Sequence, residues 1–130
     1  MIVVDSSVWI AHFRGEASPA RSRLGDLLRR GIDVAITEVI YMELLRGVRT
    51  DPEVDVLRRL LQQTTILRLT WLADFELAAE LYRRVRQDGH TVRQATDCMI
   101  AAVCVREDVP LLHEDADFDH LARVSSLRIA

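Results

Sequence analysis

Four carboxylates occupy positions in this sequence where apolar or capping residues are common. Asp5 comes directly after the apolar run IVV, and Asp115 comes shortly after the apolar segment VPLLH. Glu43 and Asp97 lie on the apolar faces of two predicted helices, because apolar residues stand three and four positions away from each. Buried acids are rare unless they are paired or bind metal. The four residues together therefore predict a site with its own chemistry.

The predicted chemistry is the binding of a divalent cation. Each acid alone has an ordinary explanation, as a turn or cap residue or as a side chain at the edge of burial. Four carboxylates brought together would repel one another, which either raises their pKa values or recruits a cation. Ligands that are all oxygen suit Mg²⁺ or Mn²⁺.

The histidines near the C-terminus do not indicate a zinc site. The segment HEDADFDH carries His113, Asp117 and His120, but no HExxH motif or Cys/His cluster supports zinc. We interpret this segment as a solvated acidic turn with incidental histidines, and His12 and His90 belong to no evident cluster. Glycine-rich phosphate-binding motifs are absent as well.

Composition limits the class of protein further. The chain has 130 residues, which we interpret as a single domain over residues 1–130. Its net charge of −3 argues against a protein that coats nucleic acid, but not against local contacts to it. No segment is suited to spanning a membrane, and Asp5 interrupts the only N-terminal apolar run, so we expect a cytoplasmic protein. Cys98 and Cys104 are expected to be buried thiols.

The predicted elements alternate between strands and helices. Strands are expected at 2–4, 33–36, 64–69, 109–113 and 127–129, and helices at 6–13, 18–30, 37–46, 51–61 and about 92–107. A further helix is expected through the apolar stripe of Ala78, Leu81, Tyr82 and Val85, ending before Gly89. Ser6 or Ser7 would cap the first helix, Ser18 the second and Thr37 the third. The alternation predicts an α/β fold with a parallel sheet, so Asp5 and Asp115 would share the edge where ligands bind in such folds.

Four segments resemble the acidic signatures of a known family. VVDSSVWI, TEVIYMELLRG, TVRQATDCMIAA and LLHEDADFD are similar to the four motifs of PIN-domain ribonucleases, and more closely to those of VapC toxins of type II toxin–antitoxin systems. The resemblance covers nearly the whole chain in the right order. It implies a PIN-like three-layer fold, with a central, mostly parallel sheet flanked by helices.

The resemblance also implies roles for the acids. Asp5 and Asp97 would bind Mg²⁺ (or Mn²⁺) directly, Glu43 and Asp115 would complete the pocket directly or through water, and Asp117 would be an accessory ligand. The activity implied is a metal-dependent endoribonuclease that leaves 5′-phosphate and 3′-hydroxyl ends, with tRNA as the first candidate substrate. The implied partners are a small antitoxin protein, which occludes the pocket, and a second copy of the chain in a homodimer.

Several neighbouring residues have two interpretations each. Ser7 matches a small hydroxyl residue of the family, but helix capping explains it equally well. His113 stands where many members carry Thr or Ser. Arg14, Arg46, Arg49 and Arg93 flank the acidic segments and could hold phosphates, but surface positions or ion pairs also explain them.

Competing functions remain open at this point. A receiver domain requires a strand-end lysine, which this chain lacks, and a haloacid-dehalogenase site requires an aspartate where Ser7 stands. A housekeeping PIN nuclease in RNA maturation, or a PIN-like scaffold that binds without catalysis, would share the same pattern.

Overall fold

The computed structural model describes residues 1–130 and confirms the α/β fold. Its four strands are β1 (Ile2–Val4), β2 (Val34–Thr37), β3 (Thr65–Leu67) and β4 (Leu111–Leu112), and they form one sheet in the order β3-β2-β1-β4. Every neighbouring pair is parallel. The two central strands are apolar except for Thr37 at the end of β2, because helices cover both faces of a parallel sheet.

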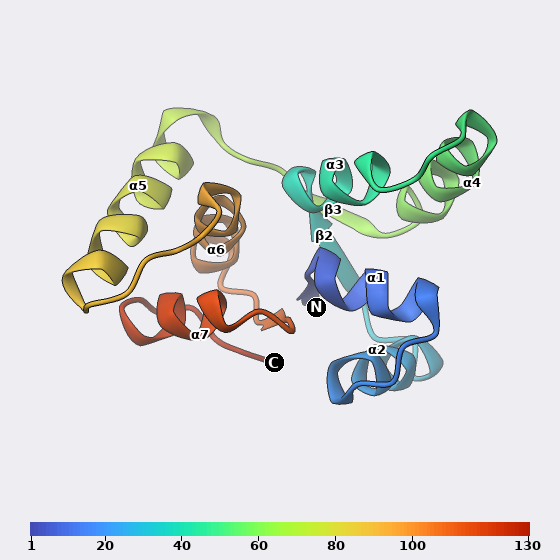
Figure 1. The fold of residues 1–130 in the computed structure, drawn as a ribbon, viewed down its shortest axis with the longest axis horizontal. Coiled ribbons are helices and arrows are strands. Elements are labelled where there is room, and N and C mark those ends of the chain that lie inside the picture. The colour runs from blue at the N-terminus through green and yellow to red at the C-terminus, as the bar shows by residue number, and fades with distance from the viewer.

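Seven helices flank this sheet: α1 (Ser6–Arg14), α2 (Pro19–Arg29), α3 (Glu38–Arg46), α4 (Asp51–Leu61), α5 (Trp71–Gln87), α6 (Ala95–Glu107) and α7 (Ala116–Arg123). In Figure 1 they form two groups, α1–α4 on one side of the strands and α5–α7 on the other. The two groups meet around the central strands, and α1, α3 and α7 begin just after the carboxyl ends of β1, β2 and β4.

Side-chain caps explain where most helices begin. Ser18 accepts a hydrogen bond from the backbone N–H of Arg21, and Thr37 accepts one from Ile40, so both predicted caps are confirmed. The prediction for α1 was wrong, because Asp5 itself is the N-cap. The strand runs into the helix without a loop, and the first acid is therefore fixed at the junction.

The segment after β4 differs most from the sequence prediction. We expected an acidic turn at residues 114–119, whereas Asp115 caps a helix that continues to Arg123. Phe118 and Leu121 are fully buried one turn apart, which supplies the packing that stabilises so short a helix. The expected strand at 127–129 is reduced to a single parallel bridge between Leu111 and Ile129.

One apolar core holds these elements together. Twenty-eight buried residues form a single cluster, which includes Val3, Val4 and Phe118. Cys98 and Cys104 are buried free thiols within it, as expected. None of the helices has the length and apolar character required to span a membrane.

Candidate metal centre

Asp5 is positioned by its own capping role. Its Oδ2 accepts hydrogen bonds from the backbone N–H of Ser7 at 3.1 Å and from the Ser7 hydroxyl at 2.6 Å. The backbone N–H of Asp5 donates to Leu112 O at 2.9 Å, which joins the ends of β1 and β4. Its second oxygen, Oδ1, is buried without any hydrogen-bond partner. One half of the carboxylate is thus held by the helix, and the other half is available for a ligand.

Ser7 connects two of the acidic segments. Besides donating to Asp5, its hydroxyl accepts a hydrogen bond from the backbone N–H of Glu114 at 3.3 Å. Of the two interpretations of Ser7, helix capping is therefore wrong, and its side chain instead orients the Asp5 carboxylate. The sequence signal for this role was the hydroxyl two positions after the first acid.

Asp115 and Asp117 lie at the start of α7. Asp115 Oδ1 accepts a hydrogen bond from the backbone N–H of Asp117 at 2.9 Å. Arg93 bridges the two acids, with Nη2 2.8 Å from Asp115 Oδ1 and Nε 3.2 Å from Asp117 Oδ2. The backbone N–H of Arg93 also donates to Asp117 Oδ2, at 3.0 Å. Among the arginines that the sequence suggested as phosphate ligands, this one lies at the acidic cluster as an ion pair.

Asp97 lies in the first turn of α6 and is nearly inaccessible, with 6% of its surface exposed. One carboxylate oxygen from each of Asp97, Asp115 and Asp117 lies within 4.8 Å of the others. The structure thus brings Asp117, which the resemblance made only an accessory ligand, into the tightest group of acids. Asp5 and Glu43 lie outside this group of three.

Glu43 approaches from α3. Its Oε2 lies 3.5 Å from the Ser6 hydroxyl and 4.0 Å from Arg46 Nη2, while its Oε1 is buried without a partner. Burial, and then the charge of Asp5, raises the pKa of Glu43. The side chain that the helical spacing placed on an apolar face is therefore buried and lies within electrostatic range of Asp5.

Mutual repulsion is strongest at Asp97. Burial is the largest cause that raises its pKa to about 7, and the charges of Asp5, Asp115, Glu43 and Asp117 add to it. Burial also raises the pKa of Asp5, against the hydrogen bonds from Ser7. The charges of the other four acids named from the sequence thus all act on Asp97.

The donor set fits a divalent cation. The ligand atoms are all carboxylate oxygens, which Mg²⁺ and Mn²⁺ prefer, and two of them are buried without hydrogen-bond partners, Asp5 Oδ1 and Glu43 Oε1. Positive charge is scarce among the five acids, because only Arg93 and Arg46 reach them with ion pairs. A bound cation would supply the charge that this cluster lacks.

The histidine interpretation was wrong in two respects. The His113 side chain is 6% exposed rather than solvated, and its Nδ1 accepts a hydrogen bond from the backbone N–H of Asp115 at 3.0 Å. Its Nε2 lies 3.2 Å from Asp119 Oδ1 without the alignment of a hydrogen bond. His90 and His120 stack with their ring centroids 3.9 Å apart. Hydrogen bonds from backbone N–H groups and ring contacts of this kind cannot be predicted from the sequence pattern.

The raised pKa of Asp97 predicts how pH changes the stability of the metal-free protein. Its pKa is about 7 in the folded chain and near 3.8 when unfolded, so the folded state holds a proton that the unfolded state has lost. The free energy of unfolding should therefore fall as pH rises from 5 to 8. Thermal unfolding in EDTA measures this decrease, and 10 mM Mg²⁺ should reduce it. A melting temperature that rises over this window in EDTA would contradict the prediction.

Comparisons with known proteins identify the family. Residues 2–124 match the PIN domain. The chain belongs to the PIN domain family. Ribonuclease VapC11 of Mycobacterium tuberculosis is 38% identical over 131 residues, which cover 100% of this chain and 98% of that protein. Ribonuclease VapC19 of the same organism is 30% identical over 86% of each chain. The resemblance to VapC proteins that the four acidic segments suggested is confirmed over the full chain.

Solved structures of the PIN fold agree with the architecture. The VapBC2 complex of Rickettsia felis, bound to a DNA fragment from its promoter, superposes with a TM-score of 0.76 and 17% identity over 100% of this chain and 98% of that one. VapC20 of M. tuberculosis superposes with a TM-score of 0.71 and 17% identity over 98% of this chain and 99% of that one. At this identity the likeness confirms the PIN-like fold.

Proposed function

We propose that this PIN domain is a divalent-metal-dependent endoribonuclease and the toxin of a toxin–antitoxin pair. The observation that carries the proposal is the group of buried and half-buried acids near the carboxyl ends of β1 and β4, with oxygens of Asp97, Asp115 and Asp117 within 4.8 Å of one another. Identity of 38% to a VapC ribonuclease over the full chain supports the same activity.

Asp5 and Asp97 would hold Mg²⁺ (or Mn²⁺) directly, Glu43 and Asp115 directly or through water, and Asp117 as an accessory ligand. A cation bound there lowers the pKa of a water molecule and stabilises negative charge on a phosphodiester. Hydrolysis by water would leave 5′-phosphate and 3′-hydroxyl ends.

The surrounding residues orient these ligands. Ser7 holds Oδ2 of Asp5 and leaves Oδ1 free, which fixes the direction of the unpaired oxygen. The backbone N–H of Asp117 holds Asp115 Oδ1. Arg93 neutralises part of the charge of Asp115 and Asp117, and 71% of its side chain is exposed, so it can also meet a phosphate of the substrate.

The substrate would be RNA, with tRNA as the first candidate. A structural relative, VapC20, is described as a toxin that cleaves the sarcin–ricin loop, so ribosomal RNA is the natural comparison substrate. Both classes should be offered in the same assay, since a shared fold does not determine which RNA is cut.

The partners proposed are a small antitoxin protein and a second copy of the chain. Several neighbours of similar fold are solved as toxin–antitoxin complexes, among them VapBC2 of R. felis. On α1 the structure buries Trp9 and leaves Phe13 45% exposed. Trp71 and Leu72, at the start of α5, add exposed apolar surface that a homodimer could cover. We place the activity in the cytoplasm.

Cleavage of total bacterial RNA by the purified chain tests the proposal. We expect discrete products that carry 5′-phosphates with Mg²⁺ or Mn²⁺. We expect none in EDTA, which removes the cation, or with Glu43→Gln, which removes one of the carboxylates that would hold it. Sequencing of the new 5′ ends distinguishes tRNA from ribosomal RNA. Products that persist in EDTA would reject metal dependence, and intact RNA with all metals would favour a binding scaffold.

A housekeeping role in RNA maturation remains the alternative for an active enzyme. The toxin interpretation predicts arrested growth on expression, relieved by co-expression of a small protein encoded beside this chain. Cleavage without growth arrest would favour the alternative.

A further inference from the structure

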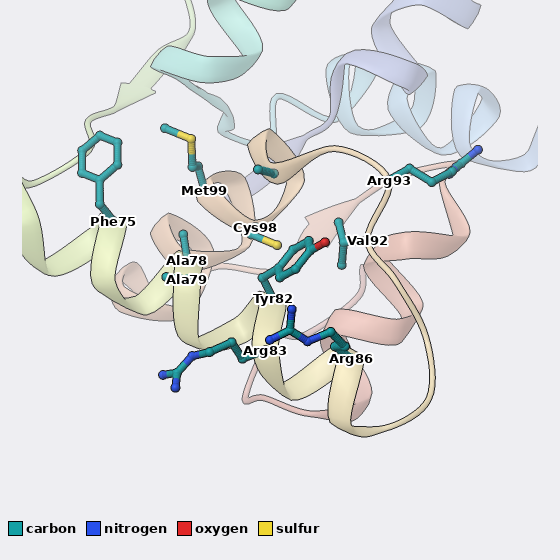
Figure 2. Close-up of a pocket in the computed structure, with 11 residues that line it drawn as sticks. Phe75, Ala78, Ala79, Tyr82, Arg83, Arg86, Val92, Arg93, Cys98 and Met99 are labelled. Carbon is teal, nitrogen blue, oxygen red and sulfur yellow. The ribbon is translucent and has the colours of Figure 1, made fainter.

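A pocket lies beside the acidic cluster, between α5, the segment that joins α5 to α6, and the start of α6. Its volume is about 620 Å³, which lies in the range of sites for small ligands. Eight of its eleven lining residues are hydrophobic, including Tyr82, Val92 and Met99. Figure 2 shows the Tyr82 ring extending from α5 toward Val92 on the opposite wall. None of the five acids proposed as metal ligands lines this pocket.

All charged residues that line the pocket are arginines. Arg83 and Arg86 are exposed on α5 and form no ion pair with a carboxylate, in contrast to Arg84 between them, which pairs with Glu80. In a chain with net charge −3, a pocket with arginines and no acid is suited to a negatively charged ligand.

The aromatic wall is suited to a planar ring. Tyr82 is half-buried, and the Arg86 guanidinium carbon lies 5.8 Å from its ring centroid. Aromatic side chains next to arginine provide the surface on which bases of single-stranded nucleic acids stack. An apolar floor, an aromatic ring and unpaired guanidinium groups together match a nucleotide, whose base is planar and whose phosphates are anionic.

Arg93 links this pocket to the acids. It lines the pocket and also bridges Asp115 and Asp117. Figure 2 shows its side chain leaving the joining segment on the side away from Tyr82. In addition, Cys98, on the pocket wall, directly follows Asp97 in α6. A neighbouring nucleotide of an RNA strand bound at the acidic cluster can therefore reach this pocket.

We propose that this pocket binds one nucleotide of single-stranded RNA next to the scissile phosphate, with the base against Tyr82 and a phosphate at Arg83 and Arg86. The inference rests on the proposed function for its substrate class. A second copy of the chain is the other conceivable occupant, but a symmetric contact here would bring two sets of unpaired arginines together.

Binding of fluorescent single-stranded RNA to the Glu43→Gln protein, measured by anisotropy in Mg²⁺ at several salt concentrations, tests the pocket without cleavage. With Arg83→Gln/Arg86→Gln we expect the magnitude of the slope of log affinity against log salt to fall by about 1.4, which is about a 25-fold loss of affinity at 0.1 M salt if affinities are equal at 1 M. The matched control is Arg23→Gln/Arg30→Gln, which removes two exposed, unpaired arginines, one in α2 and one directly after it, across the molecule from α5 (Figure 1).

Tyr82 provides an independent test of base stacking. Tyr82→Ala should weaken RNA binding at least about fivefold, whereas Tyr82→Phe keeps the ring and should bind like the parent. RNA carrying 4-thiouridine should crosslink to peptides that contain Tyr82 or Val92. The crosslink is measured on the protein that retains Tyr82, so it remains informative even if Tyr82→Ala unfolds.

The outcomes separate this inference from the proposed function. Metal-dependent cleavage with unchanged RNA binding in the pocket variants, and crosslinks elsewhere, would overturn the pocket alone. Crosslinks in the pocket of a chain that cuts no RNA would uphold the pocket and reject the nuclease. If light scattering shows that the pocket variants instead convert a dimer to a monomer, the occupant is a second copy and the inference is wrong.

Discussion

Asp97→Asn should abolish metal-dependent RNA cleavage and stabilise the metal-free protein at pH 8. Asn keeps the shape of the side chain but removes the charge that repels Asp5, Asp115 and Glu43. The loss of a metal ligand should lower the cleavage rate at least about 100-fold, since even residues that only support a ligand reduce activity 10- to 100-fold. Because the ionised Asp97 destabilises the fold above its pKa of about 7, its removal should raise the free energy of unfolding by roughly 1–3 kcal/mol.

The same variant should remove most of the pH dependence of the melting temperature in EDTA. The control is Asp108→Asn, which removes one charge from the opposite end of α6, where the side chain is 86% exposed. It should leave cleavage and stability unchanged, and Asn tolerates the left-handed conformation there (φ 52°). Cleavage by Asp97→Asn at the parent rate would reject the proposed mechanism, and a lower melting temperature at pH 8 would reject the repulsion argument.

The positions of the acids could be predicted because sequence periodicity and parallel topology determine them. The ends of two neighbouring parallel strands must share one edge, which placed Asp5 near Asp115. Helical spacing placed Glu43 and Asp97 on buried faces. These inferences need only backbone geometry, so one sequence suffices.

The features that were missed depend on contacts between distant segments. The acid-rich residues 114–119 predict a turn, because the packing of Phe118 in the core, which stabilises α7, cannot be inferred from local composition. The Arg93 bridge likewise needs the α5–α6 connection to lie against α7. Resemblance to VapC sequences supplied Asp117, which the spacing alone did not single out.

The cap positions explain how so many acids are tolerated in one place. Asp5 and Asp115 are N-caps, and Asp97 and Asp117 lie in first turns, where the helix dipole favours negative charge. Backbone N–H groups thus offset part of the repulsion before any cation binds. The arrangement allows a cluster of buried carboxylates to remain folded while two oxygens stay unpaired.

A second large effect is expected at the ion pair between Asp74 and Arg106. The sequence did not predict this pair, and neither residue is one of the five acids of the candidate metal site. Asp74 is 1% exposed, and Arg106 Nε lies 2.9 Å from its Oδ1. Asp74 Oδ2 also accepts the backbone N–H of Thr70, and Arg106 Nη2 donates to Arg68 O. Burial alone would raise the pKa of Asp74, but these hydrogen bonds outweigh it and lower the pKa.

This pair joins the start of α5 to the end of α6, and removing Arg106 leaves the Asp74 carboxylate buried without its charge partner. Arg106→Ala should lower the free energy of unfolding by about 3–5 kcal/mol in urea titrations. Arg58→Ala, which breaks a half-exposed pair with Asp55, is the matched control and should lower it by less than about 1 kcal/mol. Asp74→Leu/Arg106→Leu should lose less stability than Arg106→Ala, because no buried unpaired charge remains. Equal losses in Arg106→Ala and Arg58→Ala would show that the buried pair does not secure α5 against α6.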